Sequence, residues 1–434
     1  MADRADEKNL SNPSRRDFIK KSAVAGLALG AASLARPYLR KAVAAPRDHF
    51  LVGHPFPGTG GMAGFGEATP WVEDRAVEVI NKQGGIYIEE YGKQVPLKIM
   101  HVDTESDDTK AAEIAAKLIL QDKVDLMMVL HGPPVVNPVT AICERDKMPC
   151  VVGDNPVEAW MVGGPYHWSF HACWTVDSLI NVFIGLWESL GDKTNKVVGF
   201  LFPNDPDGVE WAKTFSERLP PRGFKIVDPG RFPFFMKDYT SIISSFKKEK
   251  VEILTGCVIP PDWSTAWRQC HQQGFFPKVA TVGKALLFPS AVEALGGSLP
   301  NGLTTEEWWS RKAPFKSSLT GESPEDLCAA WEAETKKQWV QPIGAKHCAM
   351  ERLYDTMKRA KTLDKEKIRQ ALAATDLDTI MGHIKYNEKN YSETPLVIGQ
   401  WVKGEKFPWD LKVVYNKQNP HIPLEEELLF PIPQ

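Results

Sequence analysis

The chain has 434 residues, of which 43% are hydrophobic and 25% are charged. This composition is typical of a globular protein with more than one domain. The 52 basic and 55 acidic residues are interspersed and give a formal net charge of −3, which argues against nucleic acid as a partner. The seven cysteines include no CxxC pair and are not grouped with histidines at metal-ligand spacing, so we expect no metal and no other cofactor. Cys143 and Cys150 could form a disulfide, which only their separation in the fold decides.

The N-terminus has the features of an export signal. The stretch SRRDFIK contains the adjacent Arg15 and Arg16, a large apolar pair and a lysine, and so matches the twin-arginine pattern. The apolar run at 22–35 is too short to stay in a bilayer, and it is followed by an A-x-A cleavage triplet that ends at Ala44. We therefore expect the twin-arginine translocase to export the chain. Removal of the signal peptide, residues 1–44, would leave a soluble periplasmic protein.

Strand-like and helix-like segments alternate through the mature chain. An example is the strand predicted at Leu97–Val102, which is followed by an amphipathic helix at 107–121. Strict alternation implies a parallel sheet covered on both faces, hence an α/β fold. The pattern restarts after His167–Thr175, which favours two doubly wound units. Further predicted strands are Val124–Leu130, Met148–Val152, Lys196–Phe202, Val251–Cys257 and Lys278–Val282.

A glycine-rich loop follows the first predicted strand. Gly58, Gly60 and Ala63 match the dinucleotide fingerprint G-x-G-x-x-A, but Asp103 lies much farther away than the expected twenty residues. An exported dinucleotide-dependent oxidoreductase is therefore an alternative rather than the main interpretation. The sequence contains no G-x-S-x-G, P-loop or H-E-x-x-H motif, so we do not expect an enzyme.

Four stretches carry a resemblance to a known family. They are NKQGGI at 81–86, DTESDDTKAAEIAAKLILQDKV at 103–124, KDYTSIISSFKKEK at 237–250, and GHIKYNEK at 382–389 with QW at 400–401. In this order and at these separations they resemble the leucine/isoleucine/valine-binding protein family of ABC-transporter receptors. The resemblance covers essentially the whole mature chain. It implies the type I periplasmic-binding fold, with two Rossmann-like doubly wound lobes joined by three crossovers.

The resemblance also implies the domain organisation and the function. Lobe 1 would contain residues 45–171 plus 303–376, and lobe 2 would contain 172–302 plus 377–434, which puts the later crossovers near 303 and 376. The protein would close by a hinge motion around a small organic solute and deliver it to an ABC-transporter permease in the inner membrane. A ligand-sensing partner of a signalling receptor on the same fold is an alternative that the sequence leaves open.

Site residues follow from the resemblance only by position. In lobe 1, Phe65 takes the place of an aromatic over the ligand. His131 and Gly132 lie in the turn after the third strand, and Asp154 and Asn155 lie in the turn after the fourth.

Asp207 falls near a tyrosine that the family places in lobe 2. Two departures from the family pattern concern the ligand. Pro133 has neither a hydroxyl nor an N–H for a ligand carboxylate, and Lys284 replaces the glutamate that binds an α-ammonium. Since a lysine repels an ammonium, these departures favour an aromatic or other apolar carboxylic acid over a branched-chain amino acid. The alternative is that Lys284 pairs with a nearby carboxylate such as Asp207 across the cleft and does not contact the ligand.

Overall fold

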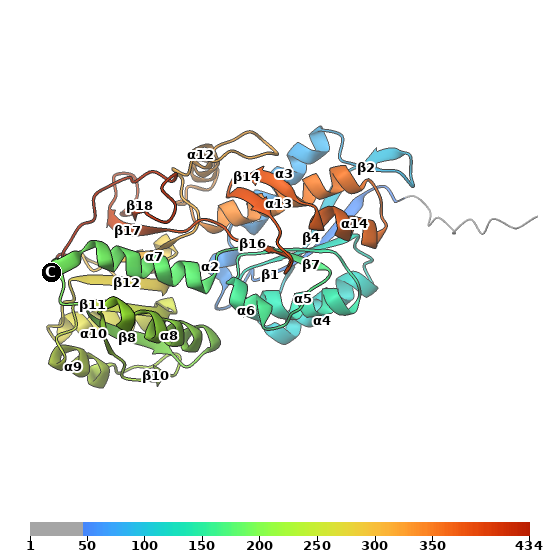
Figure 1. Ribbon diagram of the computed structural model, residues 1–434. Coiled ribbons are helices and arrows are strands. Elements are labelled where there is room, and N and C mark those ends of the chain that lie inside the picture. The colour runs from blue at the N-terminus through green and yellow to red at the C-terminus, as the bar shows by residue number, and fades with distance from the viewer. Residues whose placement is uncertain (1–46) are drawn as a thin grey trace, which may run out of the picture. The chain divides into compact units, whose positions relative to one another are not determined.

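Two β-sheets with helices on their faces organise residues 47–434, the part of the chain that the computed structural model describes (Figure 1). Arg15, Arg16 and the cleavage triplet lie outside the described residues. Within this part, no helix is both long and apolar enough to cross a membrane.

The first sheet has the strand order β16-β7-β6-β5-β1-β4, and all of its pairs are parallel. Its central strands read as continuous apolar runs because helices cover both faces, which is usual for a parallel sheet. Helices α3 (Thr69–Lys82) and α13 (Pro342–Ala360) contact β4, β5 and β6, whereas α4 (Asp108–Leu120) and α5 (Pro133–Arg145) contact β1, β5, β6 and β7. The strands are β1 (Phe50–Phe56), β4 (Leu97–Asp103), β5 (Leu126–Leu130), β6 (Cys150–Gly153), β7 (Ser169–Ala172) and β16 (Tyr391–Ser392).

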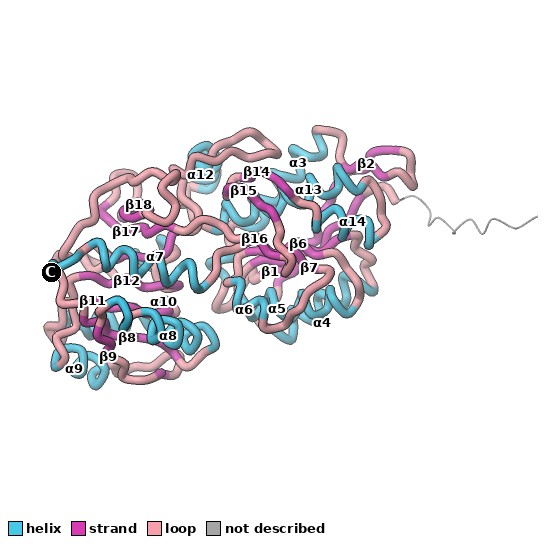
Figure 2. Tube along the Cα trace, viewed as in Figure 1, coloured by secondary structure: helices cyan, strands magenta, loops and turns pink. Residues whose placement is uncertain are grey.

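The second sheet has the order β10-β8-β11-β12-β13-β17-β18, with β9 paired to β8. Its parallel part ends at β13, after which β17 and β18 continue it antiparallel. Figure 2 shows β17 and β18 as neighbouring magenta segments. The strands are β8 (Val197–Pro203), β9 (Lys225–Val227), β10 (Arg231–Phe232), β11 (Ile253–Val258), β12 (Val279–Lys284), β13 (Thr304–Glu307), β17 (Val397–Lys403) and β18 (Trp409–Tyr415).

Most helices begin at a side-chain cap or a proline, as the local sequence dictates. In α4, for example, the Asp107 carboxylate accepts a hydrogen bond of 2.7 Å from the N–H of Lys110. Helices that accompany the first sheet are α2 (Ala63–Gly66), α3 (Thr69–Lys82), α4 (Asp108–Leu120), α5 (Pro133–Arg145), α6 (Val157–Met161), α13 (Pro342–Ala360) and α14 (Lys365–Ala373). The others are α7 (Val176–Ser189), α8 (Pro206–Arg218), α9 (Thr240–Lys248), α10 (Pro260–Gln272), α11 (Pro289–Glu293) and α12 (Pro324–Thr335). Two 3-10 turns, η1 (Gly191–Lys193) and η2 (Pro220–Arg222), and two small hairpins, β2 (Ile86–Ile88) with β3 (Lys93–Val95) and β14 (Asp376–Thr379) with β15 (Gly382–Lys385), complete the fold.

The α/β fold class with two parallel-sheet lobes and three crossovers is confirmed. The first crossover follows β7. The second lies later than residue 303, because β13 pairs with β12 and β17 in the second sheet. The third lies later than residue 376, because β16 returns to pair with β7 in the first sheet before the chain crosses. The suggested disulfide is also absent, since Cys143 and Cys150 are both buried free thiols.

Candidate functional site

Three predicted residues of lobe 1 meet at the carboxyl ends of β5 and β6. The His131 and Asp154 side chains lie 3.3 Å apart, and the Gly132 N–H donates a hydrogen bond of 2.8 Å to the Asp154 carbonyl. His131 and Asp154 have positive φ angles of 91° and 55°, an unusual backbone for residues other than glycine. Such strain persists where the surrounding structure holds it, and it is frequent at binding sites.

Lys346 of α13 joins this group and had not been predicted. Its Nζ atom donates to the Phe65 carbonyl at 2.8 Å, lies 3.2 Å from His131 Nδ1, and is 4.0 Å from the Asp154 carboxylate. The Lys346 side chain is fully buried. Lys346 therefore connects the loop that carries Phe65 to the two strand ends.

Burial controls the charges of this group. Removal from water lowers the pKa of Lys346 to about 8, and it raises the pKa of Asp154 to about 6 although Lys346 opposes that rise. Burial, followed by repulsion from Lys346, lowers the pKa of His131 well below its ordinary value. At neutral pH lobe 1 thus holds one lysine–aspartate pair beside a neutral imidazole.

The other two predicted residues of lobe 1 face different neighbours. The Phe65 ring lies 4.8 Å from the ring of Phe288 in lobe 2, edge to face, so Phe65 contacts both lobes. Asn155 is buried and its amide donates to Asn137 at 3.2 Å, away from the His131 group.

In lobe 2, Lys284 and Asp207 form an ion pair. Lys284 ends β12 with a φ of 66°, and its Nζ atom lies 2.5 Å from Asp207 and 3.7 Å from Asp205, the N-cap residue of α8. Its side chain is 23% exposed. Burial alone would lower the pKa of Lys284, but the nearby Cys257, Asp207 and Asp205 raise it above its ordinary value. Lys284 is therefore charged and within reach of solvent.

The glycine-rich loop is not arranged for a dinucleotide. The Asp103 carboxylate accepts hydrogen bonds from the N–H groups of Gly58 at 2.8 Å and Thr59 at 3.1 Å, and from the Thr59 hydroxyl at 2.8 Å. These are the donors that a pyrophosphate needs. Because Asp103 already occupies these donors, the loop does not support the oxidoreductase alternative.

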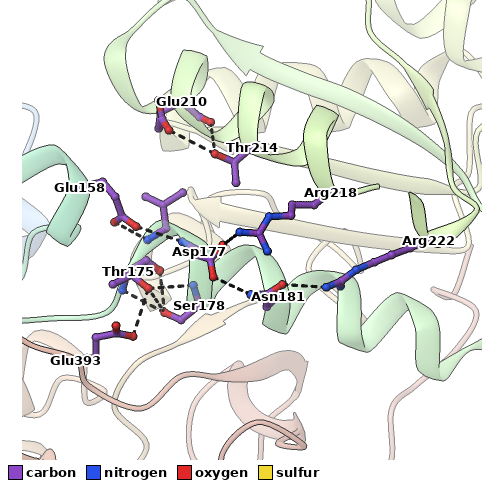
Figure 3. Close-up of polar contacts among 11 residues, drawn as sticks. Glu158, Thr175, Asp177, Ser178, Asn181, Glu210, Thr214, Arg218, Arg222 and Glu393 are labelled. Carbon is purple, nitrogen blue, oxygen red and sulfur yellow. Dashed lines mark hydrogen bonds and ion pairs between the residues drawn. The ribbon is translucent and has the colours of Figure 1, made fainter. Parts of the chain in front are cut away.

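A cavity of about 1110 Å³ lies beside the first and third crossovers rather than at the strand ends. It is lined by Glu158 of α6, by the start of α7 and by residues 393–396, among others, and by none of the seven predicted ligand residues. Glu158 accepts a hydrogen bond of 2.7 Å from the N–H of Val176, while Thr175 bonds both Ser178 and Glu393 (Figure 3). A side chain of lobe 1 thus caps the first helix of lobe 2, and the network ties the two crossovers together.

The fold agrees with comparisons to known proteins. Residues 51–406 match the family model described as periplasmic binding protein. The structure is similar to a leucine binding protein, LivK, from Thermotoga maritima, with a TM-score of 0.70 and 19% identity over 85% of this chain and 99% of that one. It is also similar to the branched-chain amino acid transporter substrate binding protein LivJ from Streptococcus pneumoniae in complex with isoleucine (TM-score 0.70, 16% identity, 85% and 99% covered).

A third similar structure is a solute binding protein of an ABC transporter from Rhodopseudomonas palustris in complex with 3,4-dihydroxybenzoic acid (TM-score 0.67, 18% identity, 85% and 97% covered). The predicted role as a binding protein is confirmed. The chain belongs to the periplasmic binding protein family.

Proposed function

We propose that the solute is a small aromatic or other apolar carboxylic acid that binds between the lobes, with its carboxylate at Lys284. The observation that carries this proposal is a charged, partly exposed lysine at a strand end of lobe 2. Four predicted residues of lobe 1, Phe65, His131, Gly132 and Asp154, would form its side of the site, whereas the Asn155 amide binds Asn137 instead.

Two features support the choice of Lys284 as the carboxylate partner. Helix α5 begins with Pro133 and Pro134, which have no N–H groups, so its N-terminus lacks the donors that would bind an anion there. The Phe65 and Phe288 rings meet across the two lobes and offer an aromatic wall. The R. palustris structure, with its dihydroxybenzoic acid, provides a precedent on the same fold.

A neutral amide is the second candidate, and one specific observation favours it. Asp207 and Asp205 already offset the charge of Lys284, so a carboxylate solute would compete with Asp207 for Nζ. An amide could instead accept from Lys284 with its oxygen and donate to Asp207 with its nitrogen.

Benzoate and benzamide have nearly the same shape, so they can distinguish a carboxylate site from an amide site. Both are titrated by calorimetry into the wild type and into the variant Asp207→Asn. For a carboxylate site, Asp207→Asn frees Lys284 and should tighten benzoate binding by roughly tenfold, about the lower limit for one charged hydrogen bond. Asp192→Asn, which changes an exposed aspartate, should have no effect. Tighter benzamide than benzoate binding in the wild type, weakened by Asp207→Asn, would instead establish the amide.

We further propose that the chain is exported through the twin-arginine pathway and hands its solute to a permease in the inner membrane. The support is the order of Arg15-Arg16, the apolar run and the cleavage triplet. Replacing both arginines with lysine should keep the precursor inside the cell, whereas the wild-type protein should be recovered from the periplasm with an N-terminus near Ala45. A periplasmic protein that still begins at Met1 would contradict the processing.

A further inference from the structure

Two imidazoles and a carboxylate meet between the first sheet and α3. His54 lies on β1, His101 on β4 and Glu73 on α3. The Glu73 carboxylate is 2.9 Å from His54 Nδ1 and 2.8 Å from His101 Nε2, and one potential ligand atom from each residue lies within 4.8 Å of the other two. The group is separate from the solute site, since none of the three residues is among the predicted ligand contacts.

The three side chains of this group are largely buried, and their hydrogen bonds do not satisfy all of their polar atoms. The side chains of His54 and Glu73 are fully buried, and that of His101 is 18% exposed. Among the described residues, His54 Nε2 has no hydrogen-bond partner, and Glu73 Oε1 has only the contact of 2.9 Å to His54 Nδ1, which it shares with Oε2. Burying an unpaired imidazole nitrogen beside a carboxylate is costly, because the water that these groups lose is not fully replaced.

We propose that His54, Glu73 and His101 bind a divalent transition-metal ion, with Zn²⁺ as the first candidate. Two imidazole nitrogens and one carboxylate are a common donor set for such ions, and they leave one or more positions for water. The set does not suit Ca²⁺ or Mg²⁺, which prefer oxygen ligands. Bonds of about 2 Å to Zn²⁺ place ligand atoms up to about 4 Å apart, so small side-chain rotations suffice.

The residues around His54, Glu73 and His101 determine how an ion reaches this site and which charge opposes its binding. His101 is the exposed member, so the ion enters from its side. On the other side, the His54 ring stacks on that of His131 at 5.8 Å, and Lys346 lies beyond within 3.2 Å of His131. The positive charge of Lys346 lowers the affinity of the group for a cation.

The metal would brace the base of the loop that carries Phe65. Strand β1 runs directly from His54 into Phe56, whose ring packs on His101 with centroids 5.9 Å apart. The proposal does not depend on the identity of the solute, because the three ligands hold the strand and helix rather than contact the cleft.

The test uses the full chain, stripped with a chelator and titrated separately with Zn²⁺, Co²⁺, Ca²⁺ and Mg²⁺. We expect one Zn²⁺ or Co²⁺ per chain after dialysis, a visible Co²⁺ absorption band, and a higher melting temperature with these two ions only. His101→Gln should weaken binding by more than about 100-fold, since changes that touch only the outer shell of a metal site cost up to that much. The control His383→Gln changes an exposed histidine beside Asp376 and Asp378 and should bind like the wild type.

Four outcomes would overturn the proposal: no uptake of one ion per chain by the wild type, an equal response to Ca²⁺, binding that His101→Gln leaves intact, or binding that His383→Gln abolishes. His101 is partly exposed, so the variant is expected to fold. If its circular dichroism nevertheless shows unfolding, the wild-type stoichiometry and the Co²⁺ spectrum still decide the question.

Discussion

Both lobes place a lysine among carboxylates at the ends of their strands, but the two lysines differ in burial. Lys346 is fully buried, 4.0 Å from Asp154, and its pKa is lowered to about 8. Lys284 is 23% exposed, 2.5 Å from Asp207, and its pKa is raised. In lobe 2 the nearby carboxylates raise the pKa of Lys284 more than burial lowers it, whereas in lobe 1 burial has the larger effect and lowers the pKa of Lys346. We infer that Lys346 holds the loop of Phe65 in place, whereas Lys284 is available to a solute.

The variant Lys346→Met tests the structural role of Lys346 and should have the largest effect. Removing one partner of a buried pair leaves the other unpaired, so we expect a loss of about 3 kcal/mol in the free energy of unfolding at pH 7.5, measured by urea titration. The control Lys417→Met, at an exposed position, should be neutral. The loss should shrink at pH 5. Asp154 has a pKa raised to about 6, so it is protonated there and no longer needs a partner.

A double variant checks that the loss comes from the pair. Lys346→Met with Asp154→Asn removes both charges, and it should recover part of the stability at pH 7.5. Equal losses in the single and double variants would show that Lys346 acts through its bond to the Phe65 carbonyl instead.

Lys284→Ala should give the opposite pattern, with an effect on binding rather than on stability. If the solute is a carboxylate, its affinity should fall by roughly 1.5–3 kcal/mol in calorimetry, the range for a hydrogen bond to a charged group. Lys284→Glu should lose more by repulsion. Unchanged affinity in Lys284→Ala would mean that the Asp207 pair is purely structural.

The residues of the two lobes also differ in how far the sequence could predict them. Alternating segments were sufficient to predict the lobes, and the helix expected at 107–121 is α4 at Asp108–Leu120. Asp207 and Lys284 were predicted from the family resemblance by their positions, and the structure pairs them. Asp205, in the same turn as Asp207, could have been found as the N-cap of a helix that begins Pro206.

Lys346 gave no such signal. Nearly every side of α13 is buried over its first three turns, so no polar face distinguishes one lysine. His54, Glu73 and His101 are separated by 19 and 28 residues, which matches no metal-binding motif, and only the pairing of β1 with β4 brings the histidines together. The crossover positions were wrong because β13 and β16 are short strands whose sheet membership depends on distant partners.

Glu158→Gln tests whether the lobes are coupled through the first crossover. The Glu158 carboxylate of lobe 1 accepts from the Val176 N–H at the start of α7 in lobe 2. Losing the negative charge at a helix N-terminus should reduce unfolding free energy by about 1 kcal/mol. Glu113→Gln is the matched control, because this glutamate is exposed in the middle of α4 and lies at no helix N-terminus. Equal effects of the two variants would argue against a specific role for the contact between lobes.

The smallest expected effect concerns Glu306, which lies behind Lys284 in lobe 2. Its carboxylate accepts from the Lys284 N–H at 3.1 Å and the Thr305 hydroxyl at 2.8 Å, and burial raises its pKa from 4.5 to about 7. A raised pKa means that the folded protein holds this proton more tightly than the unfolded chain, so its contribution to stability falls as the pH rises from 4.5 through 7. Glu306→Gln cannot ionise and still offers an oxygen to Lys284. It should therefore match the wild type at pH 4.5 and exceed it by about 1 kcal/mol at pH 8, after the lost charged hydrogen bonds are subtracted from the gain. If Glu306→Gln is no more stable than the wild type at pH 8, Glu306 ionises in the folded protein at little cost.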